Sequence, residues 1–308
     1  MNYEYKSYGD YMKEDKMSKF AHITSVHPCY NEKLHHKIGR VHLPVAPKCN
    51  IACRFCKRCI GKESVCEDRP GVSHHIMKPA EVENYLNGLL EESPNIKVAG
   101  IAGPGDSLFN EETFETLAII QEKFPDLVRC LSTNGLLLPK YAERLADLGV
   151  KTVTVTVNAV DPKIQAQIVD WVYYEGKVYR GEEGAEILIK NQIEGVKKLA
   201  ELGVAVKINT VLIPEINMDH IVEIAKTFEK DAFIHNVIPL IPMYKMENLR
   251  KPTCDEISGV RDSAEEYLHQ FRACQQCRAD AVGLVTEHKT IGEKGKELNI
   301  YDLKHFSH

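Results

Sequence analysis

Short runs of apolar and β-branched residues alternate with longer amphipathic stretches along most of this chain. The apolar runs, which predict strands, cover residues 41–45, 97–101, 127–132, 152–158, 205–212 and 233–239. The amphipathic stretches, which predict helices, cover residues 79–92, 111–123, 140–148, 185–202 and 218–230. Pro79 and Pro139 lie near predicted helix starts, and Gly149 and Gly203 follow predicted helix ends, where these residue types are favoured.

Strands and helices in this order predict parallel strands joined by helical crossovers. Six strands are too few for a complete eight-unit barrel, so we expect an α/β fold with an open, partial (βα)6 TIM-type barrel over residues 41–240. Residues 1–40 lack clear periodicity and predict an extended N-terminal arm. Residues 241–308 are predicted to form a C-terminal extension that carries a Cys-x-x-Cys pair. We expect both extensions to lie over the barrel mouth.

The composition excludes several classes of protein. The chain has 308 residues, 44% of them hydrophobic, which is enough for a sizeable core. A net charge of -5 gives no electrostatic footprint for nucleic acid. No apolar run approaches the roughly 20 residues of a membrane span, and the polar N-terminus does not resemble a signal peptide. We therefore expect a cytoplasmic protein that binds neither nucleic acid nor a membrane.

Ten cysteines are unusual in a protein of a reducing compartment, where clustered cysteines indicate metal binding or catalysis. Most of the ten fall into two sequence clusters, at residues 49–66 and 274–277. The alternative is that cysteines act as small buried hydrophobic residues. That interpretation fits Cys254 and Cys59 but suits the clustered cysteines poorly.

Cys49, Cys53 and Cys56 directly follow the first predicted strand. A zinc site would require a fourth ligand such as Cys59 or Cys66. Three cysteines instead suit a [4Fe-4S] cluster that has one iron without a protein ligand. Together with the strand context, this spacing resembles the radical S-adenosylmethionine (SAM) pattern. The resemblance implies that SAM chelates the open iron and is cleaved to a 5′-deoxyadenosyl radical.

Small and polar residues follow the next three predicted strands. In parallel sheets, ligands bind at the carboxyl ends of the strands. We expect the glycines to let the backbone approach the SAM amino group, and the polar side chains to bind its carboxylate and ribose. For each residue alone, a turn or a strand-end cap remains the alternative. The predicted SAM-binding residues are Gly103, Gly105, Asp106, Ser132, Thr133, Asn134 and Asn158.

The outlying cysteines suggest a second metal site. Cys274 and Cys277 are not near a βαβ opening, as a thioredoxin-type pair would be, so two more thiolates favour metal binding. Cys29 can supply a third ligand if the N-terminal arm folds across the barrel. Cys130 on the third strand is either a ligand or a buried hydrophobic residue. His42, inside the first strand, is either a ligand or a hydrogen-bonded core histidine.

Seven segments together resemble the NifB family of nitrogenase cofactor maturases. The similarity runs from about residue 27 to residue 283, and the length is similar to that of the short archaeal form without a NifX-like domain. Other radical SAM enzymes share the first cysteine loop but lack the flanking motifs. The matching segments are residues 27–29 (His-Pro-Cys), 49–56, 69–72 (Arg-Pro-Gly-Val), 102–106 (Ala-Gly-Pro-Gly-Asp), 132–135 (Ser-Thr-Asn-Gly), 153–159 and 274–281.

This resemblance implies a definite chemistry. Two [4Fe-4S] clusters are fused into an eight-iron precursor, NifB-co, with insertion of a carbide and a ninth sulfur. One SAM donates the methyl group that becomes the carbide, and a second supplies the radical. The implied partners are SAM, an iron-sulfur cluster donor and a cofactor carrier or scaffold protein. The implied ligands are Cys49, Cys53 and Cys56 for the SAM cluster; Cys29, Cys274 and Cys277 for one substrate cluster; and Cys130, a cysteine after the first loop and nearby His42 for the other.

The chain departs from the family pattern at two places. The extra cysteine usually precedes Asn-Glu-Ser-Arg-Pro-Gly-Val, but the spacing differs here, so Cys59 and Cys66 are both candidates. We choose Cys66. Ser107 replaces the usual proline after Gly-Pro-Gly-Asp, a small change at a turn. The alternatives to a NifB-type activity are another radical SAM maturase with auxiliary clusters and a non-catalytic iron-sulfur or zinc scaffold.

Overall fold

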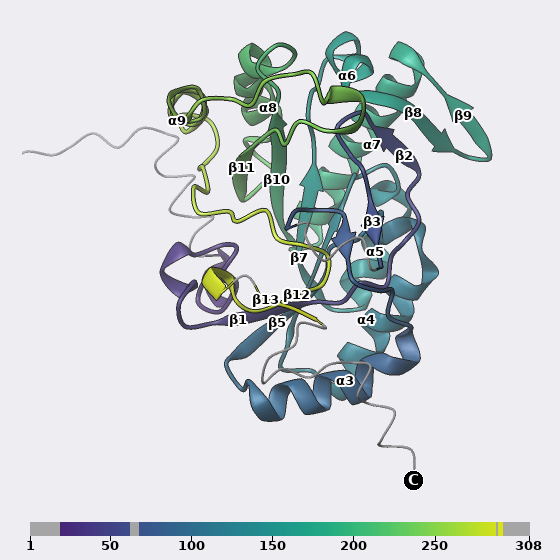
Figure 1. The fold of residues 1–308 in the computed structure, drawn as a ribbon, viewed down its shortest axis with the longest axis vertical. Helices are drawn as coiled ribbons and strands as arrows, with labels where there is room; N and C mark the ends of the chain where they lie inside the picture. The colour runs from purple at the N-terminus through teal and green to yellow at the C-terminus, as the bar shows by residue number, and fades with distance from the viewer. Residues whose placement is uncertain (1–18, 62–67, 288, 292–308) are drawn as a thin grey trace, which may run out of the picture.

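The structure, a computed structural model, describes residues 19–61, 68–287 and 289–291. Six parallel strands form a curved sheet in the order in which they follow along the chain (Figure 1). The expected six-stranded partial barrel is therefore confirmed. The strands are β1 (Gly39–His42), β5 (Ile96–Ile101), β6 (Val128–Thr133), β7 (Val150–Thr156), β10 (Ala205–Leu212) and β11 (Ile234–Pro239).

The predicted helices are confirmed with shifts of a few residues at some ends. Pro79 is the first residue of its helix, and Gly149 and Gly203 adopt positive φ angles just after theirs. None of the helices in the described part of the chain has the length and apolar character needed to span a bilayer. The helices that connect the strands are α3 (Pro79–Glu92), α4 (Glu111–Lys123), α5 (Leu138–Asp147), α7 (Gly181–Glu201) and α8 (Ile221–Phe228).

The two faces of the sheet differ in polarity, as alternation along β7 shows. Val153 and Val155 belong to the main hydrophobic core, which the sheet forms with its covering helices. Thr152, Thr154 and Thr156 line a cavity on the other face. Successive side chains of a strand point to opposite faces. One face of β7 therefore packs in the hydrophobic core, which lies outside the barrel, and the inner face of β7 lines the cavity.

A small second sheet supports the cysteine loop, and the sequence patterns did not predict it. β2 (Ile51–Cys53) pairs antiparallel with β8 (Val169–Tyr174), which forms a hairpin with β9 (Lys177–Tyr179). The strands are only three to six residues long, so periodicity could not separate them from loop. The other unpredicted elements are α6 (Pro162–Ile168), α9 (Cys254–Ala264), β3 (Cys59–Ile60), β4 (Val72–Ser73), β12 (Ala281–Leu284) and β13 (Lys289–Thr290).

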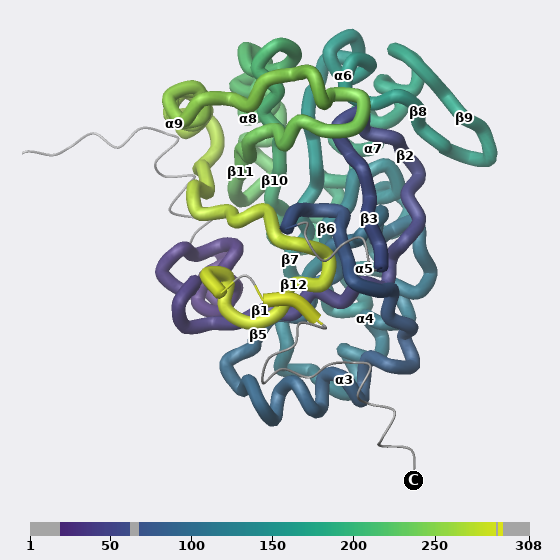
Figure 2. Tube along the Cα trace, in the orientation of Figure 1, coloured from purple at the N-terminus to yellow at the C-terminus, as the bar shows by residue number. Residues whose placement is uncertain are grey.

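The C-terminal segment closes the open side of the barrel, between β11 and β1. At one end, Gln270 forms a bridge with His235 of β11. At the other, β12 pairs antiparallel with β1, and β13 then pairs with β12. Residues 270–281 therefore run from one edge strand to the other (Figure 2). Both edges of the partial barrel are covered in this way.

The N-terminal arm is not extended over the part that the structure describes, so this expectation was wrong. A helix, α2 (Ala21–Thr24), and a single 3₁₀ turn, Glu32–Leu34, precede β1. The segment folds because its aromatic side chains pack against apolar residues of the barrel. Phe20 lies 5.4 Å from Phe233, ring centroid to ring centroid, and Tyr30 stacks on the same ring. These contacts are tertiary, and so they leave no periodicity in the sequence.

Candidate active site

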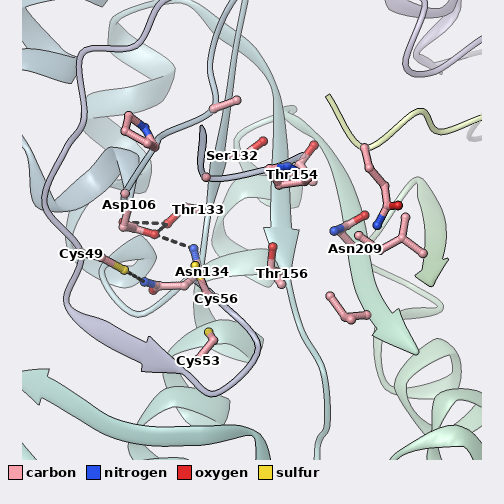
Figure 3. Close-up of a pocket in the computed structure, with 18 of the residues that line it drawn as sticks. Cys49, Cys53, Cys56, Asp106, Ser132, Thr133, Asn134, Thr154, Thr156 and Asn209 are labelled. Carbon is pink, nitrogen blue, oxygen red and sulfur yellow. Dashed lines mark hydrogen bonds between the residues drawn. The ribbon is translucent and has the colours of Figure 1, made fainter. Parts of the chain in front are cut away.

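A cavity of about 880 Å³ lies against the inner face of the sheet and is also lined by segments that follow several of its strands. Cys49, Cys53 and Cys56 all line it, brought there by the loop that follows β1 (Figure 3). The loop is tightly turned, because the Cys56 amide donates to the Cys53 carbonyl oxygen at 3.0 Å. The sequence prediction that these three cysteines face one site is consistent with this geometry.

The three thiols are suited to metal binding. Burial raises the pKa of Cys49 to about 12, with the negative charge of Asp106 adding to the effect. Burial raises the pKa values of Cys53 and Cys56 as well, and neighbouring thiolates add to the rise at Cys53. Three thiolates so close together need a positively charged partner.

The kind of metal centre follows from the spacing of the possible ligands. Within residues 19–61, 68–287 and 289–291, no three Cys, His, Asp or Glu side chains converge on a single metal ion. Each thiolate of a [4Fe-4S] cluster binds a different iron atom, so the ligands lie farther apart than those of a single metal ion. The donor set of this loop therefore fits a cluster better than a single zinc ion.

Asp106 supports the cysteine loop through a chain of hydrogen bonds. Its buried carboxylate accepts hydrogen bonds from the Thr133 hydroxyl at 2.9 Å and from the Asn134 amide at 2.6 Å. Burial raises the pKa of Asp106, although these hydrogen bonds oppose the rise. Asn134 in turn donates from its side chain to Asn50 at 2.6 Å, next to Cys49. The ends of β5 and β6 are thereby tied to the cysteine loop (Figure 3).

Gly105 lets the backbone of this edge approach the cysteine loop closely. Its amide donates to the Ala46 carbonyl at 2.6 Å, and the Asp106 amide donates to the Lys48 carbonyl at 2.8 Å. A Cβ on Gly105 would overlap the Lys48 carbonyl. Gly103 has a φ of +113°, which favours glycine. Gly105 and Asp106 thus support the loop, and direct contact of any of these residues with SAM stays a prediction.

The other predicted SAM-binding residues also lie at strand ends. Ser132 and Thr133 line the cavity beside Asn134 (Figure 3). Asn158 lines it too, but its side chain accepts the Val211 amide at 2.9 Å and so joins β7 to β10. Asn209, a polar residue expected near the ligand-binding end of its strand, lines the same wall. Thr154 and Thr156 line it too and were not predicted, although the alternation along β7 could have placed them on the inner face.

The outlying candidate ligands reach the same cavity from separate segments. Cys29 comes from the N-terminal segment, Cys130 from β6, and Cys274 and Cys277 from the C-terminal segment. Burial raises the pKa of Cys130 to about 12, and the nearby Cys29 adds to it. Burial likewise raises the pKa of Cys29, with Cys277 and Cys274 contributing. The fold therefore gathers four cysteines, far apart in sequence, around one volume.

His42 is held in one tautomer. Its Nδ1 lies 2.9 Å from the carbonyl oxygen of Arg278. Since a carbonyl only accepts, Nδ1 carries the proton and Nε2 keeps the lone pair that a metal needs. Burial lowers the pKa of His42 to about 4, so the ring is neutral near pH 7. Both interpretations of His42 thus have support, because the ring is hydrogen-bonded and also lines the cavity.

Cys59 and Cys254 do not line the cavity. Cys66 falls outside the residues that the structure describes. Cys59 is buried in β3 and does not line the cavity, as expected of a small hydrophobic residue. Cys254 was expected to be buried, but it is exposed as the first residue of α9, where the Thr253 cap fixes the helix start at the surface.

Comparison with known proteins defines the class first. Residues 43–228, more than half of the chain, match the Radical SAM superfamily. SuiB from Streptococcus suis, solved with bound S-adenosylmethionine, has a TM-score of 0.51 and 14% identity, over 99% of this chain and 61% of that one. That likeness shows the fold alone. The chain is a radical SAM protein, and this membership implies a [4Fe-4S] cluster and SAM.

Proteins of similar sequence define the family within the radical SAM superfamily. The FeMo cofactor biosynthesis protein NifB of Methanocaldococcus jannaschii is 65% identical over 96% of this chain and 100% of its own length. That of Methanocaldococcus infernus is 64% identical over the same shares of the two chains. The chain belongs to the NifB family of radical SAM enzymes, which act in FeMo cofactor biosynthesis.

Proposed function

We propose that this enzyme fuses two [4Fe-4S] clusters into NifB-co, the eight-iron, carbide-containing precursor of the nitrogenase cofactor. SAM serves both as the methyl donor for the carbide and as the source of the 5′-deoxyadenosyl radical. One observation carries the proposal: the cysteine loop and the outlying cysteines line a single cavity. A methyl group and a radical made at the loop therefore form next to the bound substrate.

The first part of the cavity serves SAM. A [4Fe-4S] cluster held by Cys49, Cys53 and Cys56 supplies the electron that cleaves the sulfonium bond of SAM. The hydrogen bonds between Asp106, Asn134 and Asn50 hold the loop in place. Polar side chains on the strand wall, from Ser132 to Asn209, are placed to bind the carboxylate and ribose of SAM.

The second part of the cavity serves the substrate clusters. Cys29, Cys274 and Cys277 hold one cluster, and Cys130 and Cys66 hold the other with His42. Neither set supplies four cysteines, so each cluster keeps iron atoms that the protein does not bind. Incomplete ligation lets the two clusters react with each other and lets the product leave. The walls keep the reacting groups at about 3–3.5 Å, the approach that bond formation requires.

The wider role includes other proteins. An iron-sulfur cluster donor supplies the substrates, and a carrier or scaffold protein accepts the product in the cytoplasm. Residues 270–281 and the N-terminal segment act as a cover that loosens for this exchange. Limited proteolysis checks the cover, because loading with clusters should increase its protection, and equal cleavage with and without clusters would reject it.

Substitution of the C-terminal cysteines tests the proposal. After anaerobic reconstitution with iron and sulfide, Cys274→Ala and Cys277→Ala should each hold about one cluster less, or about four iron atoms. With dithionite and SAM they should still release 5′-deoxyadenosine, but make no eight-iron product. Cys254→Ala removes an exposed cysteine and serves as the matched control. Unchanged iron in both variants would reject the substrate-cluster site, and a wild type that cleaves no SAM would indicate a scaffold.

A further inference from the structure

Two cations are buried at the cavity, on β1 at one end of the parallel sheet and on β10, next to the strand at its other end. Arg40 of β1 is 1% exposed, and Lys207 of β10 is 6% exposed. Both side chains line the cavity. Burial of an isolated charge costs several kcal/mol, so natural proteins rarely bury one without an opposite charge.

No protein carboxylate neutralises these cations in the part of the chain that the structure describes. Among the described residues lining the cavity, the one carboxylate is that of Asp106, which Thr133 and Asn134 already engage beside the cysteine loop. Lys207 donates only a long hydrogen bond, 3.4 Å, to the Cys29 carbonyl oxygen.

The remaining contacts of Lys207 and Arg40 compensate their charges only in part. The Lys207 ammonium lies 5.2 Å from the Tyr30 ring centroid and 5.5 Å from that of Phe271, a weak cation–π arrangement. Arg40 donates to the carbonyl oxygens of Gly283 at 2.8 Å and Leu284 at 3.2 Å, while its buried Nε has no hydrogen-bond partner among the residues that the structure describes.

The charges are directed at the outlying cysteines. The Nη2 of Arg40 lies 3.2 Å from the sulfur of Cys277. The Lys207 ammonium lies 3.4 Å from the carbonyl oxygen of Cys29. Beside them, His27 accepts the Cys29 amide at Nδ1, so the proton sits on its buried Nε2, which has no hydrogen-bond partner. This end of the cavity therefore presents donors and positive charge.

We propose that Arg40 and Lys207 form the binding site for the negative charge of a substrate cluster held by Cys29, Cys274 and Cys277. A [4Fe-4S] cluster ligated by thiolates is an anion, and its sulfides accept hydrogen bonds. The two side chains are thus positioning residues that favour a cluster over the free thiols. This inference rests on the proposed function and adds to it the reason why substrate binds at this end of the cavity.

Lys207→Met tests the inference, with Lys207→Arg as the charge-preserving control. In the metal-free protein, Lys207→Met should leave the melting temperature unchanged or raise it, because it removes an uncompensated buried charge. After reconstitution it should hold about four iron atoms fewer than wild type and still cleave SAM, whereas Lys207→Arg should keep wild-type iron. A purely structural lysine would instead lower the melting temperature of the metal-free variant.

Three results would overturn the inference. If wild type holds more than one cluster and Lys207→Met holds as much, the cation is not needed, although the proposed function stands. If wild type itself holds only one cluster, the proposed function fails as well. A small oxyanion would be the ligand if sodium sulfate raises the melting temperature of metal-free wild type but not of Lys207→Met, with equal iron in both. Arg40→Gln is a less selective test, since Arg40 also holds β12.

Discussion

Gly100 and Cys130 are register partners on the adjacent strands β5 and β6, and a Cβ on Gly100 would lie 2.7 Å from the Cys130 sulfur. On the other side, Gly100 is the register partner of His42, whose Cδ2 would lie 3.4 Å from that Cβ. The absent side chain thus leaves room between a candidate thiolate and a candidate imidazole ligand. Glycine in a strand interior is otherwise unfavourable.

Gly100→Ala should therefore displace Cys130 and weaken the cluster that it holds. We expect less iron after reconstitution and a free energy of unfolding lower by about 1–3 kcal/mol, as for overpacking of a well-packed site. SAM cleavage should persist, because the cysteine loop lies elsewhere. Iron analysis and chemical denaturation provide the measurements. Gly259→Ala is the control, since a Cβ there meets nothing within 4 Å; equal iron in both variants would contradict the assignment.

Asp106→Asn should disrupt the SAM cluster. The amide replaces one acceptor oxygen by a donor, which faces the Asn134 or Leu108 amide and leaves it without a partner. The loss of a buried acceptor costs about 1–3 kcal/mol. We expect a lower melting temperature and at least a tenfold lower yield of 5′-deoxyadenosine. Asp161→Asn makes the same exchange at an exposed helix cap and should keep full activity. Wild-type yield in Asp106→Asn would show that this support is dispensable.

His235 should make the folded state less stable in acid. Burial, with the nearby Arg261 charge, lowers its pKa from 6.5 to about 3. The neutral ring is favoured only in the folded protein, so its contribution is complete above pH 6.5 and is lost as pH falls toward 3.

Between pH 7 and pH 5, His235 should thus reduce the free energy of unfolding by about 2 kcal/mol. Urea denaturation of the metal-free protein at both pH values measures this effect. His235→Gln keeps a partner for Thr210 and should show a smaller loss than wild type, whereas the surface variant His36→Gln should match wild type. Parallel behaviour of all three proteins would refute the prediction.

Asp280→Asn should loosen the C-terminal segment. The buried Asp280 carboxylate accepts from the Arg278 guanidinium at 2.8 Å and from the His74 amide at 2.7 Å. Although burial raises the pKa of Asp280, these bonds lower it overall, so the carboxylate is stabilised.

With that charge removed, residues 270–281 should be cleaved faster by protease, and the iron bound at Cys277 should fall. Breaking a buried pair costs about 3–5 kcal/mol, so chemical denaturation should detect the change. Asp262→Asn weakens an exposed ion pair with Arg272 and is the control. Unaltered proteolysis would mean that strand pairing alone holds the segment.

The sequence was sufficient for the elements whose periodicity is local. All six parallel strands and the five helices named from their apolar pattern are present, because each buries apolar side chains in the hydrophobic clusters of the fold. The loop of Cys49 was identifiable from its cysteine spacing together with the predicted strand that precedes it. Elements held by tertiary contact were not predictable, and α2 and β12 are examples: each is short, and its partner strand or ring lies far away in the sequence.

The candidate site likewise has features that the sequence predicts and features that only the structure shows. Residue types indicated which side chains could bind a ligand. They did not indicate which of these side chains are already hydrogen-bonded to other protein groups. Asp106 and Asn158 follow strands as a ligand-binding residue would, yet each is bound to neighbouring protein groups in the structure. Arg40 and Lys207 gave no sequence pattern, because one buried cation within a strand looks like any other polar position. Only the alternation of inner and outer residues, applied to all strands at once, could have placed them.

The attachment of residues 270–281 at both ends has an entropic consequence. A free tail that bound a cluster would lose conformational freedom with every residue that it ordered. This segment is anchored at Gln270 and again at β12, so the freedom of Cys274 and Cys277 is already restricted before substrate arrives. Their effective concentration at the site is therefore high and largely independent of protein concentration. In the proposed function, these cysteines would therefore need little ordering to bind a substrate cluster, and little would be regained when the product leaves.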